Sequence, residues 1–309
     1  MRLPLALLAI AVSGCGVVEH SAAKTTANIL EKAQPSLQRE SDYDLAAKAV
    51  PGALKTIEGF YVADENPQLR AIITEGYCQY ATAFVEDEWE VAKFAGKIDD
   101  GKYISGRASK MFARCMNYAL MDLGSGFQKD IFGTPEQAQK RIMATDDRRA
   151  LLWAAAGLGG MINHNLDRAE MVSYLPIVKM MLEHLVDLNK SHSPASCGSD
   201  SNCLVHLALP HIALGMVYSA ASKEFGGKAD VATAEFQQAL QITGDKMLLP
   251  RVLWAYRVGL MTGDRKLFHE QLVKVLETDP AVWPEQRLAN EVAHRRARRY
   301  LSHEKELFQ

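Results

Sequence analysis

Cys15 is the residue whose chemistry is easiest to assign from its neighbours. It follows an apolar run, Leu3–Val12, and the residues Val12-Ser13-Gly14 before it have the spacing of a bacterial lipobox. An apolar stretch this short suits the core of a signal peptide better than a stable membrane-spanning helix. We therefore expect residues 1–14 to be removed as a signal peptide and the thiol of Cys15 to accept the lipid. The alternative is an ordinary secretory signal peptide.

A second group of residues combines two thiols with two imidazoles: His192, Cys197, Cys203 and His206. Zinc uses such ligands, but these spacings are not those of a common zinc module, and the intervening Ser, Asn and Gly residues are typical of a surface turn. In an oxidising compartment, a disulfide between Cys197 and Cys203 is the favoured interpretation, and no metal is predicted. A metal-dependent or thiol enzyme at this loop is the alternative.

The remaining cysteines, Cys78 and Cys115, lie inside helical patterns. A buried cysteine usually behaves as a small hydrophobic residue. Neither residue is part of a recognisable Cys/His signature for nucleophilic catalysis. We therefore expect both to be free, buried thiols.

Motifs that would indicate an enzyme are missing from the sequence. There is no Gly-x-Ser-x-Gly elbow, no phosphate-binding Gly-rich loop and no His-Glu-x-x-His sequence. The glycine-rich run Gly157-Leu158-Gly159-Gly160 does not follow a strand pattern, so it indicates close helix packing or a helix end rather than a nucleotide site. We predict no catalytic residue, no cofactor and no enzymatic activity.

Aromatic residues are the better candidates for a binding role. Stacked helical pairs leave a concave face on which aromatic side chains form an apolar cleft with polar tips. We expect Tyr77, Tyr80, Trp153 and His211 to line such a cleft. The alternative is that each of these side chains fills the core between neighbouring helices.

A basic run, His294–Arg299, lies near the end of the sequence. We expect it to form a solvated face of the last helix, favoured there by the helix dipole; contact with lipid headgroups or with an acidic partner is the alternative. The whole chain has 35 basic and 37 acidic side chains, a net charge of −2, which argues against a nucleic-acid partner.

The elements that must position these residues are helices. Hydrophobic residues make up 48% of the 309 residues, enough for a full core, and strong helix formers dominate from about residue 41. Turn-forming residues divide the chain at Pro51-Gly52, Asn66-Pro67, Gly133–Pro135, Ser193-Pro194 and Gly263-Asp264, among others. We predict an all-α fold with a tether over residues 15–40, part of which can begin the first helix, and a helical-repeat domain over residues 41–309.

The predicted helices contain a degenerate repeat. Three triplets share a spacing of four and then three residues, which places each triplet on one helical face: Ala108, Phe112 and Cys115; Ala232, Phe236 and Ala239; and Phe268, Leu272 and Val275. This is the pattern of the second helix of a tetratricopeptide repeat, and Leu214, Gly215 and Tyr218 match the first helix. The pattern predicts stacked helical hairpins, an α-solenoid.

The sequence also resembles a known family, the T-component of TRAP (tripartite ATP-independent periplasmic) transporters. The resemblance extends over residues 41–308 and is most specific toward the C-terminus. The segments that carry it include His211–Tyr218, Gly226-Gly227, Phe236–Leu240, Leu248-Leu249, Arg251–Leu253, Asp264–Phe268, Arg287–Asn290 and Arg295–Arg299.

The resemblance implies a lipid-anchored protein on the periplasmic side of the bacterial envelope that docks the solute-binding protein of a TRAP system. It further implies a homotrimer with a central pore and a hydrophobic cleft in each subunit, which holds or passes an apolar or amphipathic solute. Gly16 after Cys15 favours the outer membrane, by resemblance to known lipoproteins. A general tetratricopeptide-like scaffold for envelope complexes is the alternative function.

Overall fold

The structure is a computed structural model that describes the backbone of residues 5–221 and 226–309, with side chains from His20 onward. Residues 1–4 of the expected signal peptide lie outside the described residues, and so does the side chain of Cys15. Every regular element in the described part of the chain is helical, as the sequence predicted.

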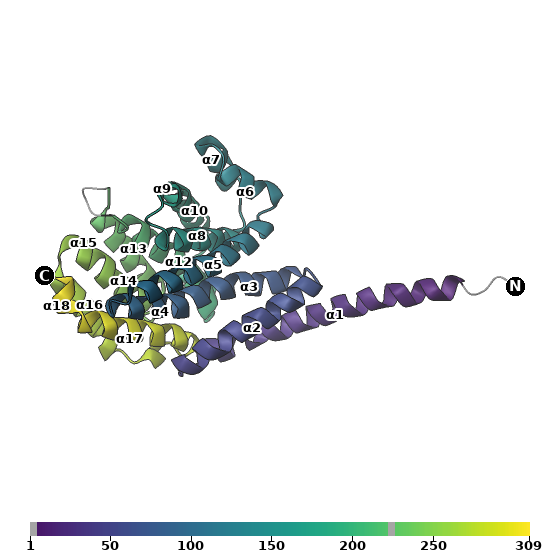
Figure 1. The fold of residues 1–309 in the computed structure, drawn as a ribbon, viewed down its shortest axis with the longest axis horizontal. Helices are drawn as coiled ribbons and strands as arrows, with labels where there is room; N and C mark the ends of the chain where they lie inside the picture. The colour runs from purple at the N-terminus through teal and green to yellow at the C-terminus, as the bar shows by residue number, and fades with distance from the viewer. Residues whose placement is uncertain (1–4, 222–225) are drawn as a thin grey trace.

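The first half of the chain forms a series of helices separated by short turns (Figure 1). They are α1 (Leu5–Gln38), α2 (Tyr43–Ala63), α3 (Pro67–Tyr80), the π-helical turn η1 (Ala81–Val85), α4 (Glu86–Phe94), α5 (Ile98–Asp122), α6 (Ser125–Ile131), α7 (Pro135–Met143) and α8 (Arg148–Asn163).

The second half continues the same pattern. Its elements are α9 (Ala169–Val172), α10 (Leu175–Asn189), α11 (Pro194–Cys197), α12 (Ser201–Tyr218), α13 (Ala229–Ile242), α14 (Leu249–Leu253), the π-helical turn η3 (Trp254–Gly259), α15 (Leu260–Thr262), α16 (Arg265–Glu277), the 3₁₀ turns η4 (Pro280–Val282) and η5 (Pro284–Gln286), α17 (Arg287–Ser302) and α18 (Glu304–Leu307).

Local sequence explains where many of these helices begin. Asp and Asn side chains accept hydrogen bonds from backbone N–H groups of the first turn at Asp42, Asn66, Asp147 and Asp264. Thr134 forms a complete capping box with Gln137. These bonds satisfy donors that a helix start otherwise leaves free.

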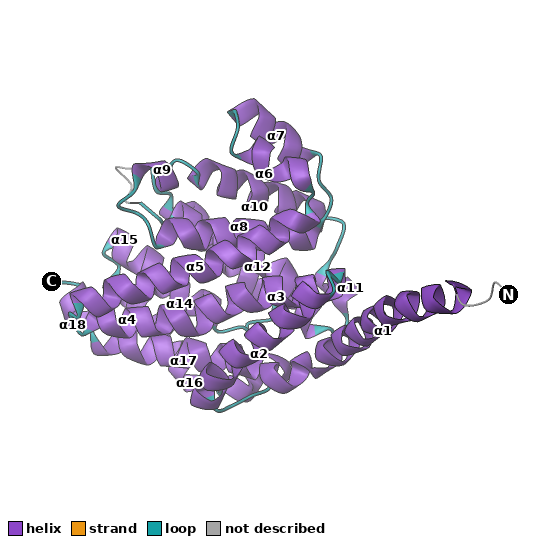
Figure 2. Ribbon diagram, turned by 45° about the vertical axis from the view of Figure 1, so that its right-hand side comes forward, coloured by secondary structure: helices purple, strands orange, loops and turns teal. Residues whose placement is uncertain are grey.

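The long helices stack in chain order. α3 packs on α5, α5 on α8, α8 on α10, α10 on α12 and α12 on α13, while α16 packs between η3 and α17. The repeat triplets account for this contact, because their nine side chains are buried, most of them completely. The stacked hairpins that the sequence predicted are therefore the architecture of the domain (Figure 2).

Glycines allow the closest of these contacts. A Cβ atom on Gly157 of α8 would lie 2.7 Å from the backbone nitrogen of Met116 and 2.8 Å from the carbonyl oxygen of Phe112, both in α5. The run of glycines in α8 therefore serves helix packing, as its sequence context indicated. Gly215 of α12 similarly lies against the ring of Phe236 in α13.

The predicted break at Pro51-Gly52 is wrong, because α2 continues through both residues. Proline removes one backbone hydrogen bond from a helix interior. Here the buried stripe of α2 extends on both sides of the proline, with Val50 before it and Leu54 and Ile57 after it. Burial of this stripe offsets the lost hydrogen bond, so the helix does not end.

The segment expected to act as a tether is helical. α1 runs from Leu5 to Gln38, and its second half packs against α3, α2 and α17. Ala23 and Ala27 face this contact and are buried, and Ala27 is completely buried. In both views the first half of α1 extends beyond the stacked helices (Figures 1 and 2).

One helix of the described chain, α12 (Ser201–Tyr218), is long and apolar enough by composition to cross a membrane. It packs between α10 and α13, and its residues Ala208, Ile212 and Leu214 are buried there. Core helices commonly have this composition, since both of their faces are covered.

Candidate functional site

The most concentrated polar site links the two ends of the stacked helices. Three carboxylates of α4, Glu86, Asp87 and Glu90, face three arginines of α17, Arg295, Arg296 and Arg299. We call these six residues the carboxylate–arginine cluster. It joins residues more than 200 positions apart and holds α17 against α4, so the stack closes on itself.

The cluster corrects part of the expectation that residues 294–299 form a solvated face, since Arg295 and Arg298 are exposed but the rest of the run is not. His294 and Arg296 are each 3% exposed, and the side chain of Arg299 is 9% exposed. Buried arginines need carboxylate partners, because an unpaired charge in the interior carries a large desolvation cost. α4 supplies those partners, so Arg296 and Arg299 lie inside the fold.

Arg296 is at the centre of the cluster. Its Nη2 donates to the carbonyl oxygen of Thr82 at 2.7 Å and to Glu86 Oε2 at 3.2 Å, and its Nε lies 3.7 Å from Glu90 Oε1. Thr82 belongs to the π-helical turn η1, where a wider turn frees a carbonyl group from regular α-helical bonding. Glu90 also accepts a hydrogen bond from Tyr300 at 2.7 Å.

A second set of contacts extends the cluster to α8 and η3. His164 Nε2 lies 3.2 Å from Glu86 Oε1, and Asn163 Nδ2 donates to the same oxygen at 3.4 Å. Arg257, in the other π-helical turn, donates to Asn163 Oδ1 at 3.2 Å. Both π-helical turns therefore contribute to one polar network, which connects α4 and α8 with α17.

The network contains the residue types of a catalytic triad, since Ser105 Oγ lies 3.0 Å from His164 Nδ1. The surroundings give these residues a different role. The side chain of His164 is completely buried, with its ring 5.0 Å from the ring of Trp89, and Glu86 is already neutralised by Arg296. Burial raises the pKa of Glu86, but the hydrogen bond from His164 and the charge of Arg296 outweigh it and lower the pKa. The arrangement holds helices together.

One of the expected cleft residues, Tyr77, belongs to a separate polar cluster. Its hydroxyl donates to Glu58 Oε2 at 2.9 Å, and Tyr118 donates to Glu58 Oε1 at 2.8 Å. Arg114 lies 2.9 Å from Glu58, and Lys55 also pairs with it. Burial raises the pKa of Glu58, but the hydrogen bonds from Lys55, Tyr118 and Tyr77 outweigh it and lower the pKa to about 2. Glu58 is therefore an ionised anchor shared by α2, α3 and α5.

The other three expected cleft residues lie apart from Tyr77. Tyr80 is 7% exposed and packs against Phe84, and Trp153 is 5% exposed with its ring 6.1 Å from that of His206. His211 has a 14% exposed side chain, and its Nδ1 lies 2.7 Å from Glu235 Oε2. These four residues do not meet in a single site, and none lines either of the hollows described below. Their role in a cleft stays a prediction.

The four cysteines of the described side chains form two disulfides. Cys197 and Cys203 are bonded, which closes a loop at the start of α12. Cys78 and Cys115 are also bonded, so the expectation of two free thiols is wrong. The two residues are 37 positions apart, and the close packing of α3 on α5 brings their Cα atoms to 5.4 Å. Among the side chains described, no group of three His, Cys, Asp or Glu could hold a metal ion.

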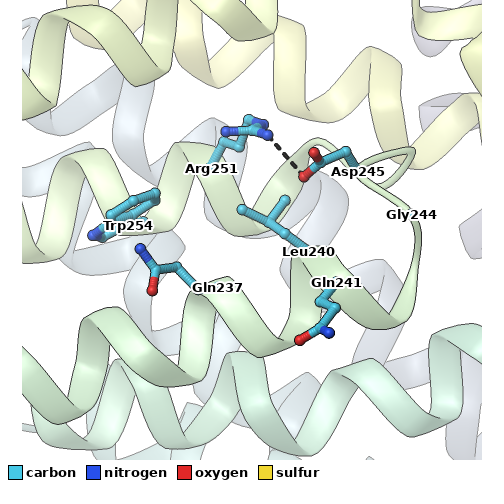
Figure 3. A pocket seen from close by; sticks show the side chains of 7 residues that line it. All are labelled: Gln237, Leu240, Gln241, Gly244, Asp245, Arg251 and Trp254. Atoms are coloured by element: carbon cyan, nitrogen blue, oxygen red, sulfur yellow. Dashed lines mark hydrogen bonds and ion pairs between the residues drawn. The ribbon is translucent and has the colours of Figure 1, made fainter.

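A surface groove of about 560 Å³ lies between α13 and the α14–η3 helix (Figure 3). Gln237 and Gln241 of α13 line one side, and Trp254 and Arg251 line the other. Arg251 donates to Asp245 Oδ1 at 2.8 Å at the end of the groove. The groove thus presents amide groups and an ion pair beside one aromatic ring, a composition typical of wet, transient protein interfaces.

A second hollow, of about 420 Å³, lies between α7 and α10. Its lining has an apolar part and a polar part. Met143, Pro176 and Met180 form an apolar part, and the polar part consists of Gln139, Lys179, Glu183, His184 and Asp187. Methionine side chains adapt to irregular apolar ligands, because they are unbranched and polarisable.

Sequence reasoning missed the carboxylate–arginine cluster, although a signal for it exists. The carboxylates of α4 and the arginines of α17 have the same spacing, with the second residue one position and the third four positions after the first. Such residues lie on one helical face. Two oppositely charged faces with identical spacing indicate a pair of helices in contact.

Comparison with known proteins agrees with this helical architecture. The family model of the TRAP transporter T-component matches residues 39–308, nearly all of the described domain. A search of the curated proteins finds no match to this chain.

Proposed function

Because this chain belongs to the T-component family of TRAP transporters, we propose that it docks the solute-binding protein of a TRAP system on the periplasmic side of the bacterial envelope. The observation that carries the proposal is the family match, which extends over the whole ring of stacked helices. We further propose that Cys15 is lipidated after removal of residues 1–14, that the anchor lies in the outer membrane, and that the protein is a homotrimer.

The groove between α13 and the α14–η3 helix is the surface that best fits docking. Its residues Gln237 and Gln241 are exposed and lie four positions apart on one face of α13. Trp254 adds an aromatic contact whose Nε1 is already bonded to Thr233 Oγ1 at 3.2 Å. Aromatic and amide side chains of this kind support specific but reversible association.

The hollow between α7 and α10 is the place that best fits a solute. Its apolar part, with Met143 and Met180, would take the hydrocarbon portion of an amphipathic molecule, and Lys179 would lie near a polar head group. Expected cleft residues such as Tyr77 and Trp153 lie elsewhere, so any role for them in solute handling is a separate prediction.

Crosslinking in the native cells tests the docking proposal. The full-length protein, tagged at its C-terminus, is crosslinked, purified and analysed by mass spectrometry for captured proteins and for subunit stoichiometry. We expect capture of a periplasmic solute-binding protein. Capture of unrelated envelope proteins without any solute-binding protein would contradict the proposal and would favour a general scaffold.

Matched variants locate the docking surface. Gln241→Arg places a bulky cation in the groove beside Arg251, and we expect it to reduce capture at least tenfold. Gln238→Arg is the control, because Gln238 is exposed on the same helix and does not line the groove. Equal capture by both variants would exclude this groove as the docking surface.

Native mass spectrometry of the purified protein tests the solute hollow. We expect a retained small molecule that is lost in Met143→Ser, since Met143 is 51% exposed and lines the hollow. Leu166→Ser is the control, because Leu166 is 59% exposed and lies outside it. Equal retention by the two variants would refute this location.

A further inference from the structure

One end of the domain exposes three large apolar side chains at the ends of two helices. The last turn of α2 contains Phe60 and Val62, which are 43% and 74% exposed, and the last turn of α5 contains Met121, which is 54% exposed. We call these three residues the apolar end. Single exposed apolar residues are common on protein surfaces, but a local group of them marks a surface that contacts something other than water.

The two helix ends that carry these residues are joined by Tyr61, which lies between Phe60 and Val62 in the sequence. Tyr61 is buried, and its hydroxyl lies 3.7 Å from the sulfur of Met121. Its ring also packs edge-on against Tyr118 of α5, with 5.5 Å between the ring centroids. The ends of α2 and α5 are therefore fixed side by side, with Phe60 and Val62 on either side of the buried tyrosine.

α1 leaves the domain at this same end. His20 Nδ1 lies 3.1 Å from Asp64 Oδ1, and Asp64 is the residue that ends α2. Ala23 and Ala27 are buried one and two turns further along α1. α1 thus passes the end of α2, and its first half projects beyond the stacked helices, as both ribbon views show (Figures 1 and 2).

The distance from this contact to the expected lipid is short. Cys15 precedes His20 by five residues in a continuous helix, and a helix rises 1.5 Å per residue, so the two residues are about 8 Å apart along α1. An acyl chain on Cys15 would therefore hold the apolar end close to the headgroup region of the bilayer.

We propose that the apolar end lies on the surface of the phospholipid bilayer, with Phe60, Val62 and Met121 entering the interface between headgroups and acyl chains. This inference rests on the proposed lipidation of Cys15. It makes the anchor two-part, since the lipid brings the domain to the membrane and the apolar end orients it. Lipid attachment combined with a protein contact holds a domain more firmly than either one alone.

The charges around the apolar end indicate which lipids it contacts. Asp64 lies against His20, and Asp122 is paired with Arg70 at 2.6 Å, while Glu65 is exposed. This end has no excess of cationic side chains among the described residues, so contact should not require anionic lipids. A zwitterionic bilayer is sufficient for the apolar contact.

An environment-sensitive fluorophore tests the proposal. The lipidated mature protein carries the probe NBD on a single new cysteine, in Val62→Cys or in the control Tyr103→Cys. Tyr103 is 71% exposed and lies 18 residues before Met121, about 27 Å along α5. On vesicles of phosphatidylcholine and phosphatidylethanolamine, we expect a blue shift and a several-fold intensity increase at position 62 only, with quenching by bromine-labelled acyl chains.

The outcomes separate this inference from the lipidation on which it rests. Mass spectrometry of the N-terminal peptide reports acylation of Cys15 directly, so its absence would refute the proposed anchor. If Cys15 is acylated and the emission of the probe at position 62 is as typical of water as that of the probe at position 103, the membrane-facing apolar end is refuted. A blue shift at position 62 without vesicles, together with the mass of an oligomer, would refute it in favour of contact between copies of the chain.

Discussion

Replacement of Arg296 by methionine tests the role of the carboxylate–arginine cluster most directly. Arg296 is 3% exposed and contacts Glu86, Glu90 and the carbonyl oxygen of Thr82. Methionine keeps most of the volume but leaves two buried carboxylates without their shared partner. Removing one partner of a buried ion pair typically costs about 3–5 kcal/mol of unfolding free energy. A loss of this size lowers the melting temperature by about 10 °C in a domain of this length.

The measurement is urea unfolding, followed by circular dichroism with the disulfides intact. Arg265→Met is the matched control, because Arg265 pairs with Glu304 at 2.7 Å but has a 55% exposed side chain. Its loss should cost about 0–1 kcal/mol, because Arg265 is solvated and Glu304 keeps His269 as a partner at 2.8 Å. The slope of unfolding free energy against urea concentration should stay constant for both variants, so the transition midpoints report their stability.

A double variant tests the physical reason for the loss. Arg296→Met combined with Glu86→Met removes both charges, and we expect it to recover part of the stability, since a neutral buried pair carries no desolvation cost. Recovery should be partial because Glu90 still lacks its contact with Arg296 in the double variant. The explanation is refuted if Arg296→Met falls within about 1 kcal/mol of Arg265→Met, or if the double variant is no more stable than the single one.

Three further results are expected from unfolding measurements on single features. Gly157→Ala should destabilise the protein by about 1–3 kcal/mol, whereas Gly159→Ala, whose new Cβ would lie 3.5 Å from its nearest side chain, should be neutral or stabilising; equal effects would contradict the packing argument. Replacing Cys78 and Cys115 by alanine should cost about 4 kcal/mol through the 37-residue separation of the disulfide, and a cost near zero would mean that the pair is not bonded. Because the pKa of Glu58 is lowered from 4.5 to about 2, its ionised form stabilises the fold at pH values above 4.5, and this stability is lost as the pH falls toward 2. Glu58→Gln should flatten the dependence of unfolding free energy on pH in this range, and an unchanged dependence would refute the role of Glu58.

The local patterns of the sequence predicted the class of the fold because they depend only on neighbouring residues. The triplets Ala232–Ala239 and Phe268–Val275 place small and large apolar side chains on one face of each helix, and each face is buried in the structure. Motif spacing likewise supported the family assignment, which the family model matches over residues 39–308. These features need no knowledge of which helices meet.

Pairing between distant helices was decided by the tertiary structure. The sequence placed Cys78 and Cys115 on buried helical faces, but only the packing of α3 on α5 makes them a bonded pair. From their spacing alone, the arginines of α17 were expected to form a solvated face. In the structure the stack closes on itself, and α4 packs its carboxylates against them. A helical period specifies which face of a helix carries the apolar or charged side chains, whereas the partner of that face depends on how all the hairpins stack. Here the stacking brings together residues more than 200 positions apart.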